Sequence, residues 1–178
     1  MKKTLSILAA LTLSGVAAFA NTDKNFQLIT TIDQKNVFKV ISPQDIDLTY
    51  AEAIADSLID NLEDVTMNAT SETKLKTVVV ATNVKDHIIK VTATGTPLAS
   101  DTATTKMGYD FVVDSNTPIE VSKGATSPVD LGTIVTVTGN GEQQVKQALL
   151  KATIKDADYK VAAAGNYVAT IVLTAEGV

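Results

Sequence analysis

The sequence predicts an all-β protein built as a β-sandwich. Short runs rich in valine, isoleucine and threonine recur between turn signals, which is the composition that pleated, half-buried strands favour. Aromatic residues make up only 4% of the chain and cysteine is absent, so neither large aromatic side chains nor disulfides dominate its stability. Burial of β-branched side chains, backbone pairing or a partner must supply that stability instead.

Nine segments carry the strand pattern, and the alternation is clearest at the two ends of the chain. Turn residues separate them, among them Gly95 with Pro97 and the run Gly139-Asn140-Gly141. Short strands at such spacing are typical of a sandwich. The predicted strands are 26–32, 37–41, 45–50, 75–81, 87–93, 109–113, 119–122, 132–138 and 167–174.

Two stretches depart from this pattern. Between residues 50 and 65 the apolar positions recur at steps of four, four and three amid alanines and acids, which predicts one inserted amphipathic helix over the sandwich. These positions are Ile54, Leu58, Leu62 and Val65. The stretch 142–154 fits a helix or a strand at its start, and its second part, 148–154, is predicted to be a strand.

Residues 1–20 have the layout of a secretory signal peptide. Two lysines precede a short apolar run, and the small-x-small triplet Ala18-Phe19-Ala20 predicts cleavage after Ala20. The run is interrupted by polar residues and is too short to span a bilayer stably. We therefore expect export through the periplasm to the cell surface, and removal of 20 of the 178 residues leaves 158, enough for one domain.

The expected mature chain is acidic. Its positive charges are all lysines, and after two of the 15 leave with the leader, 13 oppose 20 Asp and Glu residues. Such a balance argues against nucleic acid or an anionic membrane as a partner, and no later stretch is long enough for membrane insertion.

The sequence contains no recognisable catalytic or metal-binding motif. His87 is the only histidine, and without cysteine it cannot complete a familiar zinc cluster. The pairs Asp45 with Asp47 and Asp156 with Asp158 could ligate calcium, but neither has the loop spacing of an EF-hand, so solvated loop charge is the better interpretation. No serine lies in a G-x-S-x-G motif. We expect no catalytic residues, no metal site and no cofactor.

Both ends of the mature chain present an alternating comb of side chains. One face of the N-terminal strand would carry Phe26, Leu28, Thr30 and Ile32, and one face of the C-terminal strand would carry Tyr167, Ala169, Ile171 and Leu173. An ordinary first strand explains the first comb, but a free strand can also pair with a sheet edge of another molecule. An exposed last strand would invite aggregation unless something covered it.

These residues resemble the colonisation-factor-antigen type of chaperone–usher fimbriae, the alternate or alpha class, which includes cable pili. The resemblance rests on Asp23-Lys24-Asn25-Phe26-Gln27-Leu28, on the turn and strand from Ala164-Gly165-Asn166-Tyr167 onwards, and on Thr82-Asn83, Ile88-Ile89-Lys90-Val91 and Thr96-Pro97-Leu98. The absence of cysteine fits as well. The sequence departs from the pattern at 51–73, where we expect it to insert a helix, and at Gln34, where relatives tend to have proline.

The resemblance implies an incomplete immunoglobulin-like β-sandwich that is completed by donor-strand exchange. Residues 21–34 would be the donor strand and 35–178 the pilin domain. Phe26, Leu28, Thr30 and Ile32 would donate, and Tyr167, Ala169, Ile171 and Leu173 are candidates for the acceptor groove.

The implied function is that of a structural subunit of a bacterial fimbria that supports adhesion to surfaces or host cells. Its partners would be identical or related subunits, a periplasmic chaperone and an outer-membrane usher. The alternatives are a secreted single-domain binding module or a minor or tip adhesin subunit, and an enzyme is the third reading.

Overall fold

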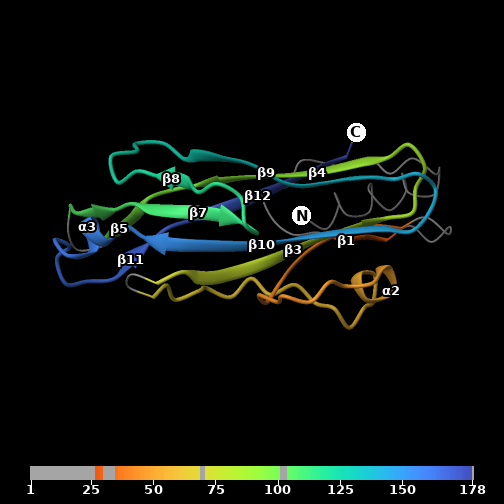
Figure 1. Ribbon diagram of the computed structural model, residues 1–178, viewed down its shortest axis with the longest axis horizontal. Helices are drawn as coiled ribbons and strands as arrows, with labels where there is room; N and C mark the ends of the chain where they lie inside the picture. Colours follow the sequence, from red (N-terminus) through yellow and green to blue (C-terminus); the bar gives the residue numbers. More distant parts are fainter. Residues whose placement is uncertain (1–26, 30–34, 69–70, 101–103, 178) are drawn as a thin grey trace, which may run out of the picture.

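The computed structural model describes residues 27–29, 35–68, 71–100 and 104–177, and for 27–29 it describes the backbone alone. Two antiparallel sheets face each other along the length of the molecule (Figure 1). This arrangement confirms the prediction of an all-β protein with sandwich packing.

The larger sheet has six strands, and each neighbouring pair is antiparallel. Its order is β1 (Gln27–Ile29), β2 (Lys35–Ile41), β3 (Thr73–Thr82), β10 (Gln144–Ile154), β7 (Tyr109–Val113) and β8 (Ile119–Val121). The smaller sheet has the order β12 (Ile171–Gly177), β4 (Ile88–Gly95) and β9 (Val129–Thr138). A third, short sheet at one end has the order β11 (Tyr167–Val168), β5 (Leu98–Ser100) and β6 (Lys106–Met107).

The main core lies between the two large sheets, where alternate residues of each strand point inward. Val78 and Val80 of β3 face Val91 of β4 and Leu131 of β9 in one cluster of buried side chains. Full burial of such an aliphatic side chain contributes roughly 1.5–3 kcal/mol. Repeated over the cluster, this burial supplies the stability that the sequence could not draw from disulfides.

A second, smaller core lies on the outer face of the larger sheet. Residues 42–68, which we call the cover segment, lie over β2 and β3 and bury Tyr50 and Ala53 against Val79 and Ala81. As a result β3 is buried on both faces along 77–82, and this explains its unbroken run of β-branched and small residues.

Most predicted strands are confirmed. The segments 37–41, 75–81, 87–93, 109–113, 119–122 and 132–138 correspond to β2, β3, β4, β7, β8 and β9, and no end differs by more than three residues. The choice of strand for 148–154 is also confirmed, and β10 extends it back to Gln144. The short strands β5 and β6 were not predicted, because three and two residues are too few to show a period.

The prediction of an inserted helix within 50–65 is wrong beyond the first turn of that helix. Helix α2 spans only Tyr50–Ala53, with a capping box between Thr49 and Glu52. The carbonyls of Ala55 and Leu58 instead accept hydrogen bonds from Lys39 Nζ at 2.8 and 2.6 Å. A buried cation on β2 therefore takes the backbone groups that a continuing helix would need.

The strand predicted over 45–50 is also wrong. Gln44 N donates to Thr77 Oγ1 at 3.0 Å, and Leu48 N donates to Gln147 Oε1 at 3.2 Å. Side chains of the underlying sheet thus satisfy this backbone, so it has no strand partner. A further single turn, α3 (Asp156–Tyr159), follows β10.

Candidate functional site: the edge of the smaller sheet

Strand β12 forms one edge of the smaller sheet. It pairs with β4 from Ile171 opposite Gly95 to Gly177 opposite Ile89, and within the described residues no strand pairs with its other side. An edge of this kind presents a row of backbone donors and acceptors that another strand can use.

The side chains of β12 are only partly covered, although they are largely apolar. Of its seven residues Ala175 alone is buried. Ile171 and Leu173 are half-buried and pack against the main core from the same face as Ala175. They therefore form an apolar surface beside the open edge of the sheet. Side chains of an added strand could cover this surface.

The four predicted groove residues all pack against the main core, but they do not lie on one strand. Tyr167 belongs to β11, where it pairs with Ser100, whereas Ile171 and Leu173 belong to β12. The break falls at 169–170, where Thr170 exchanges hydrogen bonds with Thr96. The single strand predicted over 167–174 is therefore wrong, since this exchange turns the chain from one sheet into the next.

Tyr167 is held in place by two polar contacts. Its hydroxyl donates to Ala163 O at 3.0 Å and lies 2.9 Å from Thr105 Oγ1. These contacts tie the ring to the end of the sandwich, away from the run of β12. Of the four candidates, Ile171 and Leu173 are the two that line the open edge.

The core behind the start of β12 is tightly packed. Gly95, which pairs with Ile171, lies so close to Tyr109 that an added Cβ would be 2.7 Å from the phenol oxygen. Burial raises the pKa of Tyr109 to about 12, so this phenol is neutral. Glycine at this position lets the two sheets approach each other under the edge.

The predicted donor strand falls mostly outside the described residues. Phe26, Thr30 and Ile32 lie outside them, and for Leu28 the backbone alone is described. That backbone belongs to β1, where Leu28 pairs with Asn36 of β2. The described part of the N-terminal segment is thus the outermost strand of the larger sheet.

His87 lies in the turn before β4. Its backbone oxygen accepts a hydrogen bond from Gly139 N at 2.6 Å, and burial of the ring lowers its pKa. Nowhere in the described part of the chain do three or more His, Cys, Asp or Glu side chains gather as metal ligands would.

The four aspartates considered as calcium ligands each have another interaction. Asp45 pairs with Lys74, Asp156 with Lys160 and Asp158 with Lys123, whereas Asp47 accepts a hydrogen bond from Gln147 Nε2 at 2.9 Å. In each pair the two carboxylates have separate partners, and Asp158, unlike the other three, is buried.

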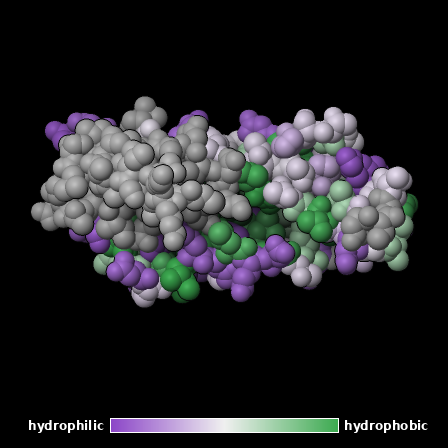
Figure 2. All heavy atoms as spheres, turned by 180° about the vertical axis from the view of Figure 1, so that it is seen from behind, coloured by the Kyte–Doolittle hydropathy of each residue, from purple (hydrophilic) through white to green (hydrophobic). Residues whose placement is uncertain are grey.

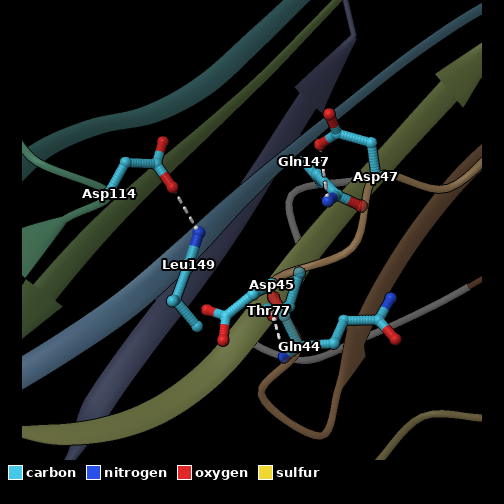
Figure 3. A pocket seen from close by; sticks show the side chains of 7 residues that line it. All are labelled: Gln44, Asp45, Asp47, Thr77, Asp114, Gln147 and Leu149. Carbon is cyan, nitrogen blue, oxygen red and sulfur yellow. Dashed lines mark hydrogen bonds between the residues drawn. The ribbon is translucent and has the colours of Figure 1, made fainter.

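A shallow depression of about 290 Å³ lies over the outer face of the larger sheet (Figure 3). Gln147 reaches Asp47 there, Asp114 accepts from Leu149 N at 2.7 Å, and Thr77 accepts from Gln44 N. These contacts join the cover segment and the turn after β7 to the sheet. They are structural, and they provide no nucleophile with a base beside it.

Among the described residues no helix has the length and apolar character needed to cross a membrane. No protein-family model matches the chain, and no curated protein or solved structure matches it. The fold defines the class of protein as an all-β sandwich of two antiparallel sheets, in which β12 is a partly covered edge strand.

Proposed function

We propose that the protein is a structural subunit of a bacterial surface fimbria and that it polymerises by donor-strand exchange. The observation that carries this proposal is the edge of β12, where half-buried Ile171 and Leu173 lie beside a row of backbone groups without a strand partner in the described chain. A strand from a second subunit would cover both the side chains and the backbone.

The strand order supports an immunoglobulin-like sandwich with one strand to be added. Such a sandwich has strands A, B, E and D in one sheet and C, F and G in the other. The order β2, β3, β10, β7 matches A, B, E, D, and β4 beside β12 matches C beside F. The place next to β12 is the one that G would take, and we propose that another subunit fills it.

The donor in this proposal is the segment 21–34, with Phe26, Leu28, Thr30 and Ile32 entering the edge. Burial of Phe, Leu and Ile side chains contributes roughly 1.5–3 kcal/mol each before the cost of ordering the strand is subtracted. In the described backbone β1 pairs with β2 through three residues only. Donation of the segment to another subunit would require this pairing to break.

Export and assembly factors complete the proposal. The leader predicted over 1–20 would direct the chain to the periplasm, where a chaperone would cover the edge of β12 until an outer-membrane usher exchanges it for a donor strand. Without such cover the edge would be an aggregation site. The fibre would then support adhesion without any catalytic group.

The test is a pair of substitutions on opposite faces of the donor segment. Thr30→Arg should abolish fibres, because its bulk costs about 1–3 kcal/mol and its buried charge adds several more, whereas Thr31→Arg should be tolerated. Electron microscopy of cells and SDS-resistant ladders measure assembly, and the yield of chaperone-bound subunit excludes misfolding. Equal assembly by the two variants contradicts the assigned donor face.

The acceptor side is tested by Leu173→Lys with Lys90→Ala as its control, since Lys90 is exposed on β4. Leu173→Lys should block assembly but still permit secretion to the periplasm. Normal fibres from this variant would exclude β12 as the acceptor.

A further inference from the structure

The cover segment has a charge pattern unlike the rest of the chain. Its 27 residues include seven carboxylates and no lysine, arginine or histidine. Within the described residues only Asp45 of the seven has an ion-pair partner, Lys74. The outer side of this segment is therefore a local field of negative charge.

The same segment also exposes large apolar side chains. Ile46 is 75% exposed, Ile59 74% and Leu62 58%, and with Val65 they are half of the eight exposed large hydrophobic residues of the described chain. Hydrophobic and hydrophilic side chains alternate along the lower side of the molecule in Figure 2, the side on which Figure 1 shows this segment. Exposed apolar residues that gather in one segment indicate an interaction site.

A shallow groove of about 390 Å³ runs through this surface. Ile41, Leu58, Ile59 and Leu62 line it together with Asp60 and Glu63. Apolar walls with carboxylates at the same groove suit a ligand that carries both apolar and cationic groups.

The groove is held in a fixed shape by the sheet beneath it. Asp60 Oδ1 accepts from Val40 N at 2.8 Å, and Asn61 N donates to Val40 O at 2.7 Å. Asn61 also accepts from Lys76 Nζ at 2.7 Å. A surface anchored in this way loses little freedom when a partner binds.

Most lysines that the structure describes in a second copy would already be engaged within their own chain. Lys39, Lys74 and Lys76 contact the cover segment of their own chain, and four more lie in ion pairs, namely Lys123, Lys151, Lys155 and Lys160. Lys90 lies opposite Glu176 across the β4–β12 pair. Two copies would also bring their acidic cover segments together, which is unfavourable.

We propose that the cover segment is a docking surface for a basic polypeptide segment of another protein, with its apolar side chains in the groove beside Ile59 and Leu62 and its lysines or arginines over Glu63 and Asp64. This proposal goes beyond fibre assembly and does not use β12. The two sites lie on opposite sheets, so each can be lost without the other.

The test uses the mature full chain and a synthetic amphipathic peptide of about 14 residues that alternates leucine and lysine pairs, the composition of a basic groove-binding segment. An all-lysine peptide of equal charge is the control ligand. Titration calorimetry should show that the amphipathic peptide binds at least about tenfold more tightly than the all-lysine peptide, because only it can fill the groove.

Two double variants locate the site. Each should lower the affinity for the amphipathic peptide by about tenfold or more. The first combines Ile59→Ser with Leu62→Ser, and the second combines Glu63→Gln with Asp64→Asn. The matched controls are Val161→Ser with Val168→Ser, which are 72% and 66% exposed after α3 and on β11, and Glu142→Gln. Unchanged melting temperatures confirm that the variants fold.

Salt separates the two contributions. When the salt is raised from about 50 mM to about 500 mM, the charge variant at Glu63 and Asp64 should no longer lower the affinity for the peptide. The apolar variant at Ile59 and Leu62 should still lower it, since salt screens the charges alone. The proposal is overturned if the all-lysine peptide binds equally well, or if the control variants weaken binding as much as the groove variants. Fibre assembly by the groove variants is the separate readout, and it should be normal whether or not the peptide binds.

Discussion

Strands β2 and β12 differ in burial far more than in apolar composition. In β2 six of the seven residues are buried, whereas in β12 only Ala175 is. Yet β2 contains two lysines and an asparagine, and the run from Ile171 to Leu173 is wholly apolar. Local sequence therefore does not explain the contrast.

The neighbours of each strand explain it instead. β2 lies between β1 and β3, with the main core on one face and the cover segment on the other, and β12 has β4 alone beside it in the described chain. Apolar area that is already buried has little more to gain from a partner. Of these two strands β12 has the more to gain, which is why we assign assembly to it.

The largest loss of stability should come from substitution of Lys39, because this side chain holds the cover segment over β2. Its side chain is 1% exposed, and burial lowers its pKa, although nearby Asp60 and Asp56 oppose the shift. Lys39→Ala would leave the carbonyl of Leu58 without a donor and that of Ala55 with Leu58 N as its remaining donor, and it would open a cavity beneath them, at a cost of about 3 kcal/mol.

Urea unfolding measures that cost, with Lys90→Ala as the exposed control on β4, which should change little. Hydrogen exchange at 55–61 should rise as the cover loosens. A loss below about 1 kcal/mol would show that the cover is held chiefly by its apolar contacts and not by Lys39.

The next prediction compares the loss of stability from a substitution in the core with that from a substitution at the edge. Val78 is fully buried, so Val78→Ala should cost about 2 kcal/mol in the isolated subunit, and Leu173→Ala, at a half-buried site, should cost about 1 kcal/mol. If a donor strand covers Leu173 in the fibre, its substitution should become the more damaging of the two there. Unfolding of the subunit and denaturant resistance of the fibre provide the two measurements.

Low pH should reduce the stability of the protein through Asp158, which lies on neither β2 nor β12. A hydrogen bond from Lys123 and another from Gly108 N hold its pKa below the usual range. The lowered folded-state pKa means that the stabilisation is present above the unfolded pKa of about 3.9 and is lost as the pH falls through the folded pKa. Asp158→Asn should therefore cost about 1 kcal/mol at pH 7, and this cost should shrink as the pH is lowered towards about 2.

Thermal unfolding at the two pH values measures this difference, and Lys123→Met should show the same convergence. A cost that is equal at both pH values would mean that the carboxylate acts by packing and not by its charge.

The sequence predicted the strands well where period and length agreed. β7 was predicted at its exact bounds, since YDFVV alternates cleanly between turns, and β3 was recognised from its β-branched run. Ile171 and Leu173 pack against the main core as alternate residues of β12, although the residues between and after them are half-buried as well. What the pattern could not show is that Thr96 interrupts this strand at Thr170, because that contact joins residues 74 apart.

The cover segment was misjudged for the same reason. Its apolar spacing is helical, and local sequence alone supports the helix. The structure differs because the partners of its backbone come from distant strands: Lys39 and Val40 on β2, Thr77 on β3 and Gln147 on β10. A lysine inside a strand pattern gives no sign that it will be buried and will bond two carbonyls.

The smallest effect should come from Lys74 and Asp45, which among the described residues form the one ion pair that links the cover segment to the sheet. Their side chains are 48% and 65% exposed, so solvent and salt screen the pair. Lys74→Met should cost no more than about 0.5 kcal/mol, and the cost should vanish in about 1 M salt. The loss from Lys39→Ala should persist in salt, because that ammonium group is buried. Urea unfolding of both variants at low and high salt makes the comparison. If the two losses respond equally to salt, the cover is held by surface charge, and the contrast between β2 and β12 would rest on electrostatics rather than on burial.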